Sequence, residues 1–367
     1  MNSRISEELK PKLLEKKDIF PDILGQTEVK YQLKSALMCG RHIVIVGPPG
    51  IGKTTLAKSV AKLLPEIKVN NCGYNCLPSR PLCPCCKAEA IAKSIGKRDA
   101  KGKSNEKNTE NLKTITGAQR FIRVQGSPDL TVEDLIGDID PIKAIKFGAL
   151  SIEAFTPGKI FKANNGILFF DELNRCPEKL QNALLQVLEE KKATIGSYDV
   201  DIETDFVLIA TMNPQDSSTE KLSNVLLDRF DVVYMDYPET VEIEKMIVKC
   251  KGVDLGVNFP ENLLHYSVAF VHELRNNDNL EQKPSVRATL GLYERAQANA
   301  KIKGNKIVSF EDIKEAIFSV ISHRIKLKPS IKYLQDPTKF IDEEFKKFLE
   351  ENPGFSSDKE KRSEVKG

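Results

Sequence analysis

The feature that most constrains this chain is the octapeptide GPPGIGKT at residues 47–54, a full match to the pattern G-x-x-x-x-G-K-[ST]. It directly follows HIVIV (42–46), an apolar run rich in β-branched residues, and directly precedes TLAKSVAKLL (55–64), which has a helical period. A glycine-rich turn between a strand and a helix gathers backbone N–H groups and the positive end of the helix dipole at one point. The sequence therefore predicts a phosphate-binding loop in an α/β sheet.

Each residue type in this turn has a physical reason to be there. Glycine lets the backbone turn its N–H groups inward, Lys53 is expected to reach the β- and γ-phosphates, and Thr54 is expected to place its hydroxyl on Mg²⁺. A chance match in a glycine-rich turn is the alternative, and the flanking strand and helix disfavour it. The residues predicted to bind the nucleotide here are Gly47, Pro48, Pro49, Gly50, Ile51, Gly52, Lys53, Thr54 and Thr55.

A second apolar run, ILFF at 167–170, ends in the carboxylates Asp171 and Glu172. In open α/β sheets, ligands bind at the carboxyl ends of the strands. We expect Asp171 to hold Mg²⁺ and Glu172 to orient and polarise the attacking water. An ordinary charged turn at a strand end is the alternative, which the neighbouring phosphate loop disfavours.

Three further polar residues are candidates for the same site. Asn213 closes the apolar run FVLIATMN and could position the attacking water, although Asn-Pro is also a common turn signal. Arg229, in LLDRF, could reach the γ-phosphate bound to a neighbouring subunit, the alternative being an ordinary surface ion pair. Arg287 follows Pro284 and Ser285 at a predicted helix start and could sense phosphate, or could be a plain exposed arginine.

The pattern of apolar residues divides the chain into two parts. Strand-like runs lie at 42–47, 120–125, 166–172 and 206–213, and helical patterns at 54–64 and 177–191 separate them. This alternation predicts a parallel α/β sheet with helices on both faces. After Pro238 only helical patterns follow, near 239–251, 260–276, 285–303 and 310–327, and Ser309 with Asp312 resembles a capping box.

These patterns predict a small helical domain after the α/β domain, with charged segments at both ends. The C-terminal segment is expected to fray beyond Ile341. The predicted limits are 1–20 for an N-terminal arm, 21–237 for the α/β domain, 238–330 for the helical lid domain and 331–367 for the charged tail.

The charge balance excludes little and favours no particular partner. Lys and Arg total 55 against 52 Asp and Glu, a net charge of +3, which gives no global argument for binding nucleic acid or a membrane. No apolar run approaches the roughly 20 residues that span a bilayer, and MNSRISEELKPKLLEKKD has no apolar signal core, so we expect a cytoplasmic protein. Residues 93–113 are Lys-, Asn- and Gly-rich and predict a solvated loop, with nucleic-acid contact as a less favoured alternative.

Five of the eight cysteines crowd into residues 70–91, in the pattern C-x3-C-x6-C-x-C-C. Without an export signal, such a group indicates a metal or redox site before a disulfide framework. Four thiolates can close a tetrahedral Zn²⁺ site; an iron–sulfur cluster and free thiols are the alternatives, with zinc favoured. The first choice of ligands is Cys72, Cys76, Cys83 and Cys86. The scattered Cys39, Cys176 and Cys250 are expected to be small buried apolar residues.

The ordered set of phosphate loop, FFDE, TMNP, LLDRF and PSVR resembles the AAA+ superfamily over roughly residues 20–327. Within it, the chain is most similar to the ATPase subunit of magnesium chelatase (subunit I) and the MoxR-type proteins. The resemblance is carried by FPDILGQ at 20–26, TPGKIFKANNGILFFDE at 156–172 and LQNALLQVLEE at 180–190.

This resemblance implies an ATPase that forms a ring, usually a hexamer, with Mg-ATP at the subunit interfaces. Arg229 then acts as an arginine finger in trans, and Arg287 is a second sensor that acts in cis or in trans. Ile23 and Leu24 pack near the adenine. The loop-bearing insertion of this branch corresponds to 128–165 and its hairpin to 192–206, both candidate contacts to the ring pore or a partner.

The resemblance also implies that ATP turnover remodels a partner protein. In the chelatase branch the partner carries a metal-ion-dependent adhesion domain, so the chain could be a component of a metal chelatase. A MoxR-like chaperone ATPase and a nucleic-acid-associated motor are the alternatives. A non-hydrolysing nucleotide switch is disfavoured, because Lys53, Asp171, Glu172 and Arg229 form a complete hydrolytic set.

Overall fold

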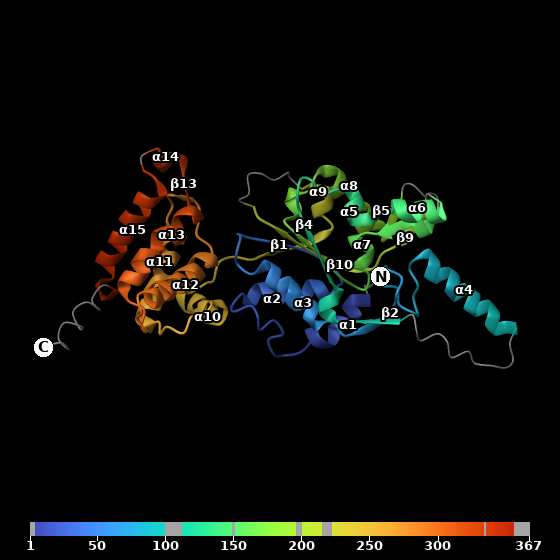
Figure 1. The fold of residues 1–367 in the computed structure, drawn as a ribbon, viewed down its shortest axis with the longest axis horizontal. Coiled ribbons are helices and arrows are strands. Elements are labelled where there is room, and N and C mark those ends of the chain that lie inside the picture. Colours follow the sequence, from blue (N-terminus) through green and yellow to red (C-terminus); the bar gives the residue numbers. More distant parts are fainter. Residues whose placement is uncertain are drawn as a thin grey trace. The chain divides into compact units, whose positions relative to one another are not determined.

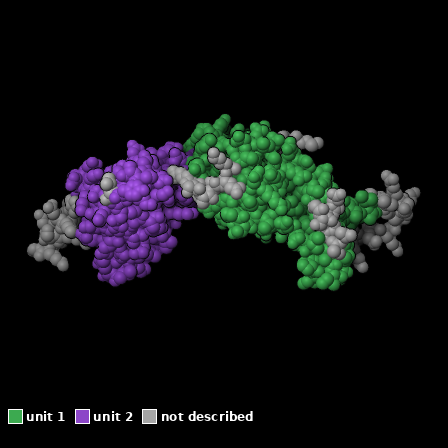
Figure 2. All heavy atoms as spheres, turned by 90° about the horizontal axis from the view of Figure 1, so that it is seen from above, with its two compact units in different colours: residues 1–23, 27–47, 52–235 green, residues 24–26, 48–51, 236–367 purple. Residues whose placement is uncertain are grey.

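The computed structural model describes residues 4–99, 112–148, 151–195, 200–214, 222–333 and 335–355. The chain divides into two compact units, coloured separately in Figure 2. Unit 1 comprises residues 1–23, 27–47 and 52–235, and unit 2 comprises 24–26, 48–51 and 236–367. Among the described residues, no helix combines the length and the apolar character needed to cross a lipid bilayer.

Unit 1 is built on a five-stranded sheet in the order β11–β1–β10–β7–β4 (Figure 1). Every pairing between neighbouring strands is parallel, which confirms the predicted sheet. The strands are β1 (His42–Val46), β4 (Phe121–Gln125), β7 (Gly166–Asp171), β10 (Phe206–Met212) and β11 (Phe230–Tyr234). The fifth strand, β11, was not predicted.

Helices cover both faces of this sheet, and for that reason its inner strands are apolar throughout. On one face Leu168 and Leu208 join a core cluster with Leu180 and Leu184 of α8 (Glu178–Glu190). On the other face α2 (Thr27–Met38) contacts β1 and β11, and α3 (Lys53–Leu63) contacts β7 and β10. The carboxyl ends of the strands are thereby held between two layers of helices.

The remaining elements of unit 1 are short and surround the sheet. Three antiparallel pairs, β2–β3, β5–β6 and β8–β9, carry the insertions. The last pair forms the hairpin predicted near 192–206, whose turn lies outside the described residues. The elements are α1 (Arg4–Leu13), β2 (Ile67–Asn70), α4 (Pro84–Asp99), β3 (Leu112–Ile115), η1 (Gly117–Arg120), α5 (Val132–Ile136), β5 (Gly137–Ile139), α6 (Pro141–Phe147), η2 (Ile152–Ala154), β6 (Phe155–Pro157), α7 (Lys159–Lys162), η3 (Leu173–Arg175), β8 (Lys192–Ile195), β9 (Val200–Glu203) and α9 (Asn224–Leu227).

Residues 4–13 of the predicted N-terminal arm form helix α1, which packs into the core of unit 1. Ile5 and Leu9 on α1 are fully buried. The buried Arg120 donates to Glu8 of α1 at 2.5 Å and to the carbonyl oxygen of Asn165 at 2.6 Å. A guanidinium that is removed from water needs such partners, so the charged face of α1 contributes to the core of unit 1.

Two expectations need correction. Residues 93–99 belong to helix α4 and residues 112–113 to strand β3, so the predicted loop is shorter at both ends, and its centre (100–111) lies outside the described residues. Among the scattered cysteines only Cys176 is buried, whereas Cys39 and Cys250 are exposed. Both exposed cysteines lie at or near helix ends that face solvent.

Unit 2 is a helical bundle with a small two-stranded sheet (Figure 1). Ser309 and Asp312 form the predicted capping box at the start of α13. In its interior Arg275 donates to both carboxylate oxygens of the fully buried Glu244. The elements are α10 (Val241–Lys251), α11 (Glu261–Asn276), β12 (Leu280–Gln282), α12 (Val286–Ile302), α13 (Phe310–Ile321), η4 (Ser322–Arg324), β13 (Lys326–Leu327), α14 (Pro329–Lys332), α15 (Pro337–Glu351) and η5 (Pro353–Phe355).

The prediction that the chain frays beyond Ile341 is wrong up to residue 355. Helix α15 buries one face on the bundle, formed by Phe340, Ile341, Phe345 and Phe348. The ring of Phe345 lies 5.1 Å from that of Phe270 and 6.1 Å from that of Phe310. The high charge of this segment belongs to the other, solvent-facing side of an amphipathic helix.

We predict that Phe345→Ala lowers the free energy of unfolding by about 3–5 kcal/mol, because it removes a buried ring from a packed aromatic cluster. Urea denaturation of the full chain, followed by circular dichroism, measures the change. Tyr333→Ala is the control: its side chain is 90% exposed, so the substitution should change stability by at most about 0.5 kcal/mol. Equal denaturation curves for Phe345→Ala and the unchanged protein would contradict the packing of α15.

Candidate nucleotide-binding site

The parallel sheet brings the ends of four strands to one edge. Met212 pairs in register with Val46, and Gln125 pairs with Asp171. The loop predicted to bind phosphate leaves β1 at this edge, and the carboxylate pair leaves β7 two strands away. Segments far apart in the sequence therefore meet where the sequence predicted a ligand site.

The phosphate loop has the backbone that its glycines were expected to supply. Gly50 and Gly52 adopt φ angles of +75° and +103°, in the left-handed region that favours glycine. Lys53 opens helix α3, and its Nζ donates to the carbonyl oxygen of Gly47 at 2.5 Å, across the loop. The lysine, the N–H groups of the first helical turn and the glycine backbone are the donor set that a triphosphate needs.

Part of this loop, Pro48–Ile51, belongs to unit 2. A Cβ on Gly50 would lie 2.8 Å from Oγ of Ser285 and 3.2 Å from Cγ of Arg287. Ser285 caps α12 by accepting a hydrogen bond from the Arg287 N–H, so Arg287 stands in the first turn of that helix. Within unit 2, the structure thus brings the predicted Arg287 close to the phosphate loop of its own chain.

The hydroxyl of Thr211, which is almost fully buried, contacts the carboxylate of Asp171 and the backbone of Glu172. This hydroxyl donates to Oδ1 of Asp171 at 2.7 Å and accepts from the backbone N–H of Glu172 at 2.9 Å. The other oxygen of Asp171 accepts from Nη2 of Arg123 at 2.7 Å. The Asp171 carboxylate is therefore fixed at the end of β7 with a cation beside it, and a carboxylate in that position fits Mg²⁺ chemically.

Glu172 is held in an unusual backbone conformation. Its φ of 58° lies in the left-handed region, which few residues other than glycine adopt. Its Oε2 accepts from Nε2 of Gln125 at 3.0 Å and pairs with Arg175 at 3.1 Å. Strained backbone of this kind persists where the surroundings fix it, and such places are often functional.

Asn213 follows β10 at the same edge of the sheet. Its carbonyl oxygen accepts from Nδ2 of Asn174 at 3.2 Å, which ties the turn after Glu172 to the tip of β10. Oδ1 of Asn174 is buried without a hydrogen-bond partner among the described residues. Asn174 thus positions the tip of β10.

Arg229 lies elsewhere on unit 1, between α9 and β11. Its guanidinium pairs with Glu189 at 3.1 Å and with Asp228 at 3.0 Å, and is one-third exposed. Exposed pairs of this kind contribute only about 0–1 kcal/mol, so the guanidinium can exchange partners at little cost. The structure therefore does not join Arg229 to Asp171 or Glu172 of its own chain by a hydrogen bond.

The two residues expected near the adenine divide between the units. Ile23 is buried in unit 1, where its Cδ1 would lie 3.4 Å from a Cβ on Gly52. Leu24 is half-buried and belongs to unit 2. Ile23 thus lies beside the phosphate loop.

Sequence reasoning missed five residues of this site: Arg123, Gln125, Asn174, Arg175 and Thr211. Only Thr211 stood inside a motif that the analysis used, and there as a neighbour of Asn213. A signal existed for Gln125, which ends the strand-like run at 120–125 with a polar side chain. Its partner could not be read from the sequence, because the order of the strands places β4 beside β7.

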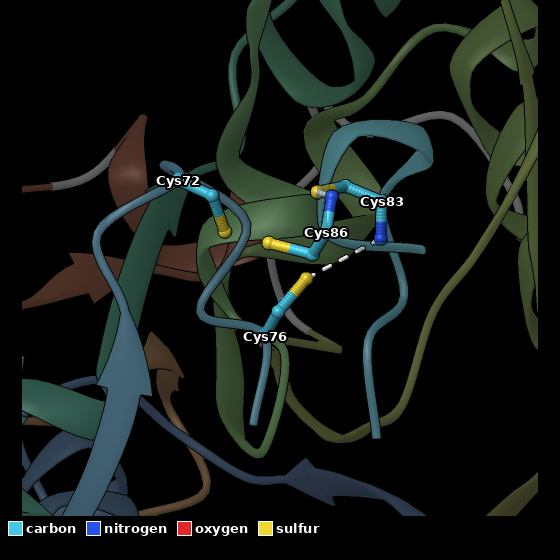
Figure 3. A group of neighbouring side chains, drawn as sticks. All are labelled: Cys72, Cys76, Cys83 and Cys86. Atoms are coloured by element: carbon cyan, nitrogen blue, oxygen red, sulfur yellow. Dashed lines mark hydrogen bonds between the residues drawn. The ribbon is translucent and has the colours of Figure 1, made fainter. Parts of the chain in front are cut away.

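The four cysteines chosen from the sequence come together in unit 1, with their sulfur atoms all within 4.8 Å of one another (Figure 3). Cys76, Cys83 and Cys86 are buried, whereas the fifth cysteine, Cys85, is exposed. Hydrogen bonds from the thiols of Cys76 and Cys83 lower the pKa of Cys72, and the same hydrogen bonds raise the pKa of Cys76 and of Cys83.

Known proteins match this chain along most of its length. Three family models match: "Magnesium chelatase, subunit ChlI" at residues 19–73, "ATPase family associated with various cellular activities (AAA)" at 98–232 and "AAA lid domain" at 272–344. A magnesium-chelatase subunit ChlI homolog of Methanocaldococcus jannaschii is 29% identical, over 84% of this chain and 86% of that protein. The magnesium-chelatase subunit ChlI of Nephroselmis olivacea is 25% identical, over 84% of this chain and 89% of that protein.

A solved structure of the BchI–BchD complex of magnesium chelatase contains a chain that is 21% identical, with a TM-score of 0.44, over 86% of this chain and 98% of that one. That overlap is too loose to support an argument, and the assignment rests on the sequence matches. They follow one another along the chain in the order of the elements described above, from the phosphate loop through the five-stranded sheet to the helical unit. The chain belongs to the AAA+ ATPases, and among them to the type of magnesium chelatase subunit I.

Proposed function

We propose that this ATPase works as a ring, in which each site for Mg-ATP is completed by an arginine of the neighbouring subunit. The observation that carries the proposal is the acidic pair Asp171 and Glu172, fixed by Thr211 at the sheet edge where the phosphate loop leaves β1. Turnover then drives the remodelling of a partner protein.

Different residues of the chain have different proposed roles in hydrolysis. Bound Mg-ATP supplies the phosphoryl group to be cleaved and the metal that neutralises its charge. Lys53 and the loop N–H groups hold the phosphates, while Thr54 and Asp171 hold the metal. Glu172 orients a water molecule and accepts its proton, with Asn213 positioning that water on the other side.

Two contacts of the acidic pair have to change for this chemistry. Arg123 occupies one oxygen of Asp171, and Gln125 with Arg175 occupies Oε2 of Glu172. We infer that Arg123 would leave Asp171 with Mg²⁺ in the site, because a divalent cation and a guanidinium repel each other at the same carboxylate. Release of Glu172 from Gln125 then frees the carboxylate that activates water.

Two arginines have different proposed roles. Arg229 acts in trans, supported by its position on the surface of unit 1 and its weak pairing there. Arg287 acts in cis, supported by the closeness of Ser285 and Arg287 to Gly50 in the same chain. Ile23 and Leu24 contact the adenine.

The partner and the assembly are proposed from the resemblance and from one surface feature. The relatives are named as chelatase subunits, and we propose a hexamer that serves a partner with a metal-ion-dependent adhesion domain, in a metal chelatase or, alternatively, as a MoxR-like chaperone. Ile142 and Ile145 on helix α6 are largely exposed within the insertion 128–165, as a partner contact requires. The domain limits given above and a cytoplasmic location stay predictions.

A second ion is proposed besides Mg²⁺. It is zinc, held by Cys72, Cys76, Cys83 and Cys86, with a structural role that is separate from hydrolysis.

We predict that Lys53→Ala abolishes ATP binding at ordinary nucleotide concentrations. Hydrogen bonds to charged groups contribute about 1.5–3 kcal/mol, so the Kd should rise roughly tenfold to hundredfold or more. Titration with a fluorescent ATP analogue measures the change. Lys58→Ala on the exposed face of the same helix is the matched control and should leave the Kd unchanged; equal affinities for both variants would contradict the proposed site.

We predict that Glu172→Gln and Arg229→Ala each bind ATP but hydrolyse it at least about 10²-fold more slowly, the first without its base and the second without its arginine finger. Steady-state phosphate release measures each purified variant.

An equal mixture of the two variants tests the trans role. In a ring with head-to-tail interfaces, about one interface in four joins an intact Glu172 to an intact Arg229, so activity should return on mixing. If both residues acted within one chain, every subunit of the mixture would be defective and the activity would stay absent.

A further inference from the structure

The cysteine group lies in a segment that has almost no regular structure of its own. Between β2 and α4, residues 71–83 contain neither a helix nor a strand, only an isolated bridge between Leu77 and Arg80. Cys76 and Cys83 are nevertheless fully buried, and no pair of cysteines in the described chain forms a disulfide. Something other than backbone pairing has to hold this loop in one conformation.

The sulfur atoms of Cys72, Cys76, Cys83 and Cys86 converge on one point (Figure 3). All four lie within 4.8 Å of one another. A tetrahedral Zn²⁺ with Zn–S distances of about 2.3 Å places its sulfur atoms about 3.8 Å apart, so a small inward movement closes the site. The four positions suffice for a complete coordination shell and leave no ligand position open for a substrate.

Hydrogen-bond donors surround the sulfur atoms. The backbone N–H groups of Leu82 and Cys83 donate to Sγ of Cys76 at 3.2 and 3.3 Å, and that of Cys86 donates to Sγ of Cys83 at 3.4 Å. Nδ2 of Asn70 donates to Sγ of Cys86 at 3.3 Å. Donors that already point at the sulfur atoms orient metal ligands and stabilise their negative charge.

The spacing decides between the metals that cysteine ligands accept. An iron–sulfur cluster puts several iron and sulfide atoms between its four thiolates, whereas these sulfur atoms leave room for a single ion. Among single ions, a closed set of four cysteines is typical of structural zinc.

The loop is fastened to the rest of unit 1 at both ends of the group. Near Cys72 and Cys76, Nδ2 of Asn75 donates to the carbonyl oxygen of Lys162 at 2.6 Å, and Nδ2 of Asn165 donates to that of Asn75 at 2.9 Å. The ring of Tyr74 packs against that of Phe161 at 5.3 Å. These contacts reach α7 and the residues that lead into β7.

Near Cys83 and Cys86 the loop contacts the end of the hairpin β8–β9. Arg80 pairs with the buried Asp205 at 2.6 Å, and Lys87 pairs with Glu203 at 2.8 Å. One rigid loop therefore contacts both α7, which belongs to the insertion 128–165, and the end of the hairpin β8–β9.

We propose that the four cysteines bind one structural Zn²⁺, which fixes the loop 71–83 and so clamps α7 and the β8–β9 hairpin in a defined relation to each other. Binding replaces four thiol protons, which pass to the solvent, with four Zn–S bonds, and no electron is transferred. This clamp goes beyond ATP hydrolysis: the nucleotide site has its own framework in the parallel sheet.

The first test is the metal content of the full chain, purified without added metal or chelator and measured by mass spectrometry. About one zinc per chain is expected. Cys83→Ser should lose most of it, while Cys85→Ser, an exposed cysteine two residues away, should keep it. A folded protein without metal, equal loss in both variants, or iron together with sulfide would overturn the proposal.

A second test does not depend on a variant that folds. The full-length protein is stripped with a chelator and then titrated with Co²⁺, whose visible spectrum reports tetrahedral thiolate ligation and whose end point should be one ion per chain. Hydrogen exchange should show residues 71–83, 159–165 and 200–205 losing protection in the stripped protein and regaining it with Zn²⁺. The absence of a thiolate spectrum, or unchanged exchange in these segments, would overturn the clamp. ATP affinity, measured in parallel, should persist in the stripped protein. Its loss would contradict the claim that the nucleotide site does not depend on the zinc.

Discussion

The hydroxyl of Thr211 is the contact on which the candidate site depends. It joins β10 to the acidic end of β7 by donating to Asp171 and accepting from the Glu172 N–H. A buried hydroxyl that both donates and accepts a hydrogen bond fixes two neighbouring groups at once. The parallel register of β1, β10 and β7 then sets the distance from these carboxylates to the phosphate loop. We propose that hydrolysis by this chain depends on that alignment, on bound Mg²⁺ and on an arginine of the neighbouring subunit.

The sequence predicted the parts of the site that are written in short segments. The phosphate loop, the acidic pair and the strand tip at Asn213 each combine a few neighbouring residues whose chemistry is specific. What it could not show are pairings across strands: Arg123 with Asp171 and Gln125 with Glu172 depend on β4 lying beside β7. The left-handed backbone of Glu172 is likewise fixed by its surroundings and has no signal in its residue type.

The fold could be predicted from the sequence where apolar runs are long. The prediction failed where charged residues are interspersed among the apolar ones. Four of the five strands, β1, β4, β7 and β10, lie in runs rich in β-branched and aromatic residues, and all four were predicted. Helix α15 carries its aromatic residues among many charged ones, so the segment looked like a solvated tail until its buried face was seen. The N-terminal segment shows the same limit: a charged arm was predicted there, but not that Glu8 of α1 pairs with the buried Arg120. Net composition conceals amphipathic helices, whereas periodicity reveals them.

The central claim is that each hydrolytic site is complete only between two subunits. Specific ATPase activity, measured across a dilution series while the assembly state is followed by mass photometry, tests it most directly. Activity per subunit should rise with the fraction of assembled ring and approach zero in the isolated monomer, because Arg229 of one chain serves Glu172 of another. A monomer that hydrolyses ATP as fast per subunit as the ring would contradict the account.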